Sequence, residues 1–210
     1  MNLGLTTSFI IGGMLMLLIV TLNLRMGQHG AELTLHEMSK THIEAIYEMA
    51  ENDFRKVAYN YNEPINGAIK IAEDNRVIFE SNLYNDTTGT NIFTIGWDFQ
   101  KEEDERIGLL ERIESTQMNI DVPSQTVVAD AAEDEKTEIN VGVTRFELNY
   151  YEAGRTFPMT TPVSPDSLEN IRRIEVFIEA QPRGGIAKNG SIYYPTSQWR
   201  KVFVPSNLNL

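Results

Sequence analysis

The chain begins with a segment that has no charged side chain. The first charge is Arg25, and the run Leu3–Leu24 is apolar along almost its whole length. A helix rises 1.5 Å per residue, so this run spans about 33 Å, which matches the hydrocarbon thickness of a bilayer. The sequence therefore predicts a transmembrane helix at residues 1–25.

Two other structures are compatible with an apolar N-terminal run: a buried core helix and a secretory signal peptide. A signal peptide has basic residues before a short apolar run that ends in small residues. Here the first basic residue, Arg25, follows the run instead. The length and the charge order favour a retained membrane helix.

This segment also contains candidate contacts between helices. Gly12 and Gly13 are adjacent small residues, which allow a neighbouring helix to approach closely. We predict that they form a packing site in the membrane together with Ile10 and Leu17.

A second helical pattern begins at Ala31 and has one apolar face. Its residues recur at steps of three and four, at Leu35, Met38, His42, Ile46 and Met49, and Val57 follows eight residues later on the same face. Asn62-Glu63-Pro64 ends the pattern, so residues 26–62 are predicted to be an amphipathic helix. Gly27 and Gly30 leave open whether the two segments form one long helix or two. Met38, Ile46 and Met49 are expected to pack either on the chain's own sheet or on a neighbouring helix.

Beyond Pro64 the hydrophobic period changes to two, which is typical of strands. Hairpins are predicted for 68–72 with 76–80 and for 92–99 with 107–113, and further strands for 141–151, 171–180 and 199–204. Loops are expected at 85–91, 115–138, 155–166 and 182–190, and the loop at 115–138 is interrupted by Thr126-Val127-Val128. Residues 63–210 are thus an antiparallel, meander-like β domain, and the predicted fold class is α+β, a long helix packed on a sheet.

Composition excludes several classes of function. The net charge of −12 argues against nucleic-acid binding, which needs clustered Lys and Arg. The absence of cysteine excludes disulfides, zinc–thiolate sites and thiol catalysis.

No motif predicts a metal, cofactor or catalytic site. His36 and His42 are six residues apart, whereas zinc-binding helices place histidines four apart on one face. The acids at 130–138 are expected to form a solvated loop, with a loose calcium site as the alternative. No phosphate-binding loop or nucleophile elbow occurs, so we expect a protein that is not an enzyme and uses no cofactor.

The order of elements resembles that of type IV pilins and type II secretion pseudopilins, and most closely the minor pseudopilin J-type group. The phrases that carry the resemblance are 53–56, 77–80, 97–99, 109–112, 140–151, 171–176 and 204–208. The resemblance implies a pilin-like fold and a structural subunit of a filament. Its implied partners are copies of itself, other pilin-like subunits and the lipid bilayer.

The N-terminus departs from the family pattern. Pilin precursors carry a basic leader that ends in Gly, followed by a Glu as the fifth mature residue. Here Gly4 would end a leader without Lys or Arg, and Phe9 would take the place of Glu. Arg25 alone favours a cytoplasmic C-terminal side. The resemblance instead implies an inner-membrane helix with a periplasmic or extracellular domain, which is the orientation we adopt.

Two alternatives remain open. The chain could be a single-pass membrane protein whose β domain binds a partner in a membrane complex without polymerising. The last alternative is a membrane-anchored enzyme, for which the sequence offers no motif.

Overall fold

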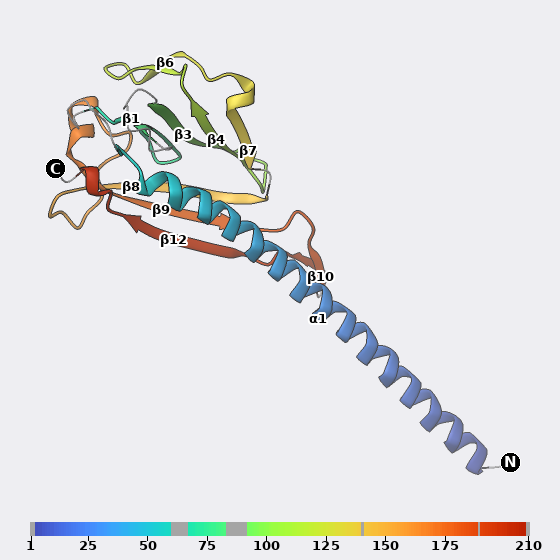
Figure 1. Cartoon of the computed structure of the whole chain (residues 1–210). Helices are drawn as coiled ribbons and strands as arrows, with labels where there is room; N and C mark the ends of the chain where they lie inside the picture. Colours follow the sequence, from blue (N-terminus) through green and yellow to red (C-terminus); the bar gives the residue numbers. More distant parts are fainter. Residues whose placement is uncertain (1–2, 60–66, 83–91, 140, 189, 209–210) are drawn as a thin grey trace.

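Figure 1 shows the computed structural model of the chain, which describes residues 3–59, 67–82, 92–139, 141–188 and 190–208. One helix, α1 (Leu3–Arg55), projects from a β-rich domain, and its C-terminal part lies against that domain. The helix is unbroken at Gly27 and Gly30, so the two predicted segments form a single helix. α1 ends at Arg55, and Lys56–Tyr59 form turns in which Ala58 has φ +59°, so the helix ends earlier than predicted. The predicted last residues 60–62 and the predicted loop at 85–91 lie outside the described residues.

The described strands form two larger antiparallel sheets and two separate hairpins. The larger sheets have the orders β1-β2-β3-β4-β7 and β12-β9-β8, and the hairpins are β5-β6 and β10-β11. The strands are β1 (Ile69–Ala72), β2 (Arg76–Ser81), β3 (Phe93–Gln100), β4 (Leu109–Ser115), β5 (Asn119–Asp121), β6 (Thr126–Ala129), β7 (Lys136–Ile139), β8 (Val143–Glu152), β9 (Ile171–Ala180), β10 (Ile186–Lys188), β11 (Ser191–Tyr193) and β12 (Ser197–Phe203). Short 3-10 helices lie at Glu133–Glu135, Pro165–Asn170 and Ser206–Leu208.

Most predicted strands are confirmed. β1 pairs with β2 and β3 with β4, as the two predicted hairpins require. The strands predicted at 141–151, 171–180 and 199–204 correspond to β8, β9 and β12. The α+β class is consistent with this structure. The single meander-like sheet is wrong, because β8, β9 and β12 form a sheet of their own.

The predicted loop at 115–138 is more structured than expected: β6 matches the predicted interruption at Thr126–Val128, but β5 and most of β7 were expected to be irregular. Its apolar side chains cover the outer face of the five-stranded sheet: Met118 and Ala131 pack with Ile71, Ile78 and Ile113, and Ile120 and Val127 pack against that cluster. Burial of this second face explains why a charged segment is structured. The predicted connector at 182–190 likewise contains β10, which pairs with β11.

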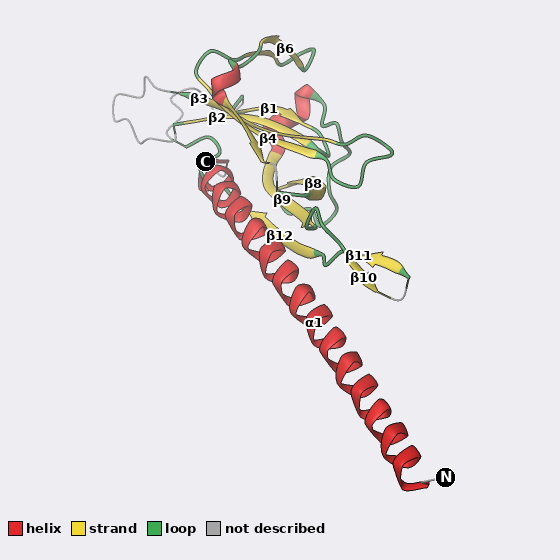
Figure 2. Ribbon diagram, turned by 90° about the vertical axis from the view of Figure 1, so that its right-hand side faces the viewer, coloured by secondary structure: helices red, strands yellow, loops and turns green. Residues whose placement is uncertain are grey.

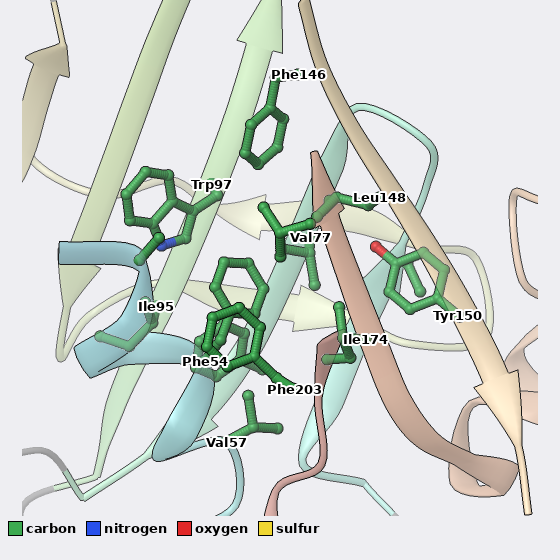
Figure 3. Packing of buried hydrophobic residues seen from close by; sticks show 14 of the residues in the cluster. Phe54, Val57, Val77, Ile95, Trp97, Phe146, Leu148, Tyr150, Ile174 and Phe203 are labelled. Atoms are coloured by element: carbon green, nitrogen blue, oxygen red, sulfur yellow. The ribbon is translucent and has the colours of Figure 1, made fainter. Parts of the chain in front are cut away.

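The main core lies between the two larger sheets and the C-terminal part of α1. Figure 3 shows Phe54 of α1 next to Phe203 and Trp97, and the ring centroids of Phe54 lie 5.4 Å and 6.1 Å from theirs. Trp97 in turn stacks on Phe146 of β8 at 6.2 Å. One helical side chain thus contacts both sheets.

Candidate assembly and membrane surface

The N-terminal half of α1 projects from the β-rich domain (Figure 1). Every described side chain from Gly4 to Ala31 is exposed. By length and composition this helix could cross a bilayer. The large apolar side chains that it leaves exposed are Leu5, Phe9, Ile10, Ile11, Met14, Leu15, Met16, Leu17, Leu18, Ile19, Val20, Leu22, Leu24, Met26 and Leu33. Such a surface is stable only when lipid or protein covers it.

Four of the predicted packing residues lie on this exposed half. Ile10 and Leu17 are 60% and 70% exposed. A Cβ added at Gly12 or Gly13 would meet nothing within 4 Å. The structure therefore leaves all four residues accessible to lipid or to another helix.

The other three predicted packing residues lie where α1 meets the domain. Ile46 is buried in the main core, and Met49 packs against that core. Met38 lies at the edge and stays 47% exposed. Ile46 and Met49 therefore pack on the chain's own domain, which was one of the two expected alternatives.

A buried carboxylate joins α1 to the five-stranded sheet. Asp53 accepts hydrogen bonds from Trp97 Nε1 at 3.0 Å and from Arg112 Nε and Nη2 at 2.7 and 3.0 Å. Arg112 Nη1 also donates to Glu114 at 2.7 Å. We call these four residues the Asp53 network. Bidentate pairing of this kind fixes geometry as well as charge.

The Asp53 network stabilises the charged form of its arginine. Burial alone would lower the pKa of Arg112. The hydrogen bonds to Asp53, and to a smaller extent to Glu114, together have a larger and opposite effect, so the pKa of Arg112 is raised. The network was not predicted from the sequence. Its signal was a carboxylate at position 53, within the same helical face as the buried Ile46, Ala50 and Phe54.

A second set of contacts ties α1 to the three-stranded sheet. Ser39 donates a hydrogen bond to the Ala180 carbonyl at 3.2 Å. Lys201 of β12 lies 2.7 Å from Glu51, and this hydrogen bond is the main reason that the pKa of Glu51 is lowered. The helix is therefore fixed to both sheets over Ser39–Phe54.

Two of the acids at 130–138, the predicted alternative calcium site, are held by other side chains. Asp130 pairs with Lys136 at 2.9 Å, and this hydrogen bond lowers the pKa of Asp130. Glu135 accepts a hydrogen bond from Ser115 at 2.6 Å. Within the described part of the chain, no three His, Asp or Glu side chains are grouped so that they could hold a metal.

Comparisons with known proteins give no match: no family model, curated protein or solved structure resembles this chain closely enough. The function is therefore inferred from the exposed apolar helix and its fixed attachment to the β-rich domain.

Proposed function

We propose that this chain is a pilin-like structural subunit, anchored in a membrane and assembled into a filament through the N-terminal half of α1. The observation that carries the proposal is the division of one continuous helix. Residues Ser39–Phe54 are fixed to the domain, whereas Gly4–Ala31 are exposed and mostly apolar. A rigid helix of this kind can transfer its apolar half from lipid to neighbouring helices without refolding the domain.

The physics of the two environments supports such a transfer. In lipid, a lone helix already satisfies its own backbone hydrogen bonds, so subunits can be stored in the membrane. In a filament, the same helices pack against one another, and a head-to-tail contact repeated with a fixed rise and rotation gives an open fibre. Gly12 and Gly13 would be the point of closest approach, because they present no side chain to a neighbour.

The domain would then lie outside the lipid. We assign it to the periplasmic or extracellular side of the inner membrane, following the resemblance to pilins and pseudopilins. Its negative charge, with 24 Asp and Glu against 14 Lys and Arg in residues 63–210, would keep filaments soluble and apart. The partners are further copies of this chain or other pilin-like subunits.

The test compares the sheared extracellular fraction with washed membranes by mass spectrometry. We expect the unaltered chain in the sheared fraction. Gly12→Leu with Gly13→Leu should remove it from that fraction while its amount in the membrane stays the same. Leu17→Met, which keeps the side-chain volume on the same helix, is the matched control and should still assemble.

A second experiment separates assembly from simple anchoring. Residues 3–24 are replaced by an unrelated membrane-spanning helix of the same length. Filament assembly requires the original surface and should be lost. If the exchanged chain keeps its function, and the unaltered chain occurs only in washed membranes, the filament proposal is wrong. The chain would then be a single-pass protein whose domain binds a partner.

A further inference from the structure

The hairpin β10–β11 lies on the side of the domain that faces the exposed half of α1. It belongs to neither larger sheet, and β10 is in contact with α1. Figure 2 shows that it extends from the domain toward the N-terminal part of the helix, whereas β6 lies at the opposite end of the domain. If α1 is embedded in a bilayer, this hairpin is therefore directed toward the bilayer surface.

The hairpin exposes apolar side chains on both of its faces. Ile192 is 63% exposed and Tyr193 is 45% exposed. The register pairs Ile192 with Ala187 and Tyr193 with Ile186, so neighbouring apolar pairs point to opposite faces. Exposed apolar side chains gathered on a small projecting element mark a contact with lipid or protein.

The base of the hairpin is held firmly. Arg106, in the connection between β3 and β4, donates from Nη1 to the Gln181 side chain at 3.1 Å and to the Pro182 carbonyl at 3.2 Å. Its Nη2 donates to the Arg183 carbonyl at 3.0 Å, and its guanidinium lies 3.7 Å from the centre of the Tyr194 ring. The hairpin is therefore a fixed projection, and its apolar side chains are held away from the core.

The charge of the hairpin segment is opposite to that of the chain as a whole. Residues 181–194 contain two basic residues and no acid, whereas the whole chain contains 30 Asp and Glu against 18 Lys and Arg. Arg183 and Lys188 lie within the hairpin segment itself. Basic residues next to a membrane helix are attracted to anionic headgroups.

The hairpin is long enough to reach the headgroups. Ser39, which contacts Ala180, lies 14 residues beyond Arg25, or about 21 Å along the helix axis. From Gln181, an extended run of seven residues reaches at most about 23 Å. The headgroup layer adds roughly 5–7 Å to each side of the hydrocarbon core. The hairpin can therefore extend from its attachment near Ser39 to the interface at the end of the apolar run.

We propose that β10–β11 is a second membrane contact, in which Ile192 and Tyr193 rest in the headgroup region of an anionic bilayer beside the exit point of α1. The proposal rests on the proposed insertion of α1 in a membrane. Tyrosine is suited to this position because its ring is apolar and its hydroxyl can stay hydrated. Contacts at two places fix the tilt and rotation of the domain relative to the membrane, which a single helix leaves free.

The test uses the full chain in vesicles of phosphatidylcholine and phosphatidylglycerol, with and without bromine on the acyl chains near the headgroups. Ile192→Trp places a fluorescent side chain on the hairpin. Val128→Trp, on β6, is the matched control, since Val128 is 66% exposed on a hairpin at the other end of the domain. Brominated lipid should reduce the emission added by Ile192→Trp about twofold and leave that added by Val128→Trp unchanged.

The outcomes separate this proposal from the proposed function. Flotation of the vesicles first establishes whether the chain inserts, and a chain that does not float with them overturns both proposals. If the chain floats but neither Ile192→Trp nor the conservative Tyr193→Trp is quenched, the hairpin does not touch lipid and only this inference fails. A blue shift without quenching would mean that protein covers the hairpin, and would also overturn it.

Discussion

Asp53 is a buried residue of α1, and its hydrogen-bond partners Trp97 and Arg112 come from the five-stranded sheet. Its side chain is 1% exposed and that of Arg112 is 15% exposed. Asp53→Ala would leave the Arg112 guanidinium and the Trp97 N–H without their main acceptor. Removal of one partner of a buried pair is strongly destabilising, so we expect a loss of about 3 kcal/mol in the free energy of unfolding. Urea denaturation of the full chain in detergent, monitored by tryptophan emission, measures this loss in the free energy of unfolding.

Glu44→Ala provides the control for that measurement. Glu44 lies on the same helix, and its side chain is 58% exposed with Lys40 at 3.9 Å. An exposed pair of this kind contributes about 0.5 kcal/mol or less. If Asp53→Ala and Glu44→Ala lowered the free energy of unfolding equally, the Asp53 network would have no structural role.

The contact between Glu51 and Lys201 predicts a pH-dependent stability. The pKa of Glu51 is lowered from 4.5, chiefly by the hydrogen bond from Lys201. A carboxylate with a lowered folded-state pKa stabilises the fold above its unfolded pKa, and this stabilisation is lost as the pH falls through the folded value. We therefore expect Lys201→Met to be less stable than the unaltered chain at pH 7, with a difference that narrows below pH 4.5.

Part of the stability difference between Lys201→Met and the unaltered chain should persist at acidic pH, and this part has a separate cause. The Lys201 ammonium also lies 5.1 Å from the Tyr47 ring and 5.5 Å from the Phe203 ring, and these cation–π contacts do not depend on the charge of Glu51. Denaturation curves at several pH values measure both parts. A difference that is constant from pH 7 to pH 3 would show that the ion pair contributes nothing.

At the scale of elements, α1 is divided into a part that stabilises the domain and a part that does not. Ile46 is 1% exposed, so Ile46→Ala should lower the free energy of unfolding of the domain by about 2–4 kcal/mol through lost burial and a cavity. Leu17 is 70% exposed, and Leu17→Ala should leave that free energy unchanged. Denaturation in detergent compares the two. A loss for Leu17→Ala as large as that for Ile46→Ala would mean that the N-terminal half also supports the domain.

How much of the β-rich domain the sequence could predict depends on the regularity of each strand's pattern. Strands β8 and β9 alternate buried and less buried residues over most of their length, from Arg145 to Tyr151 and from Ile174 to Ala180, and this pattern alone places them. The segment 115–138 has no such pattern, because only scattered residues such as Met118 and Val127 cover the sheet. The partition of the strands into two sheets was also not predictable, since it depends on contacts between distant residues such as Asp53 and Arg112.

For the candidate surface, the sequence predicted the residues but not their surroundings. Gly12, Gly13, Ile10 and Leu17 were found from an uncharged run, a signal that needs no tertiary information. Ile46 has the same periodic signal but packs inside the chain's own core. Helical periodicity identifies an apolar face, and only the tertiary structure determines which partner covers it.

For the whole molecule, the last prediction concerns the independence of the domain. Residues Gly4–Ala31 are exposed throughout, so a chain that begins at residue 31 loses no buried residue. It retains Ser39, Ile46 and the Asp53 network, which hold the remaining helix in place. We therefore expect this truncated chain to be soluble without detergent and to unfold within about 0.5 kcal/mol of the full chain in detergent. Urea denaturation and near-ultraviolet circular dichroism measure the comparison. Aggregation, or loss of the near-ultraviolet signal, would show that the exposed half of α1 is needed to fold the domain, and a helix with that role could not exchange freely between lipid and filament.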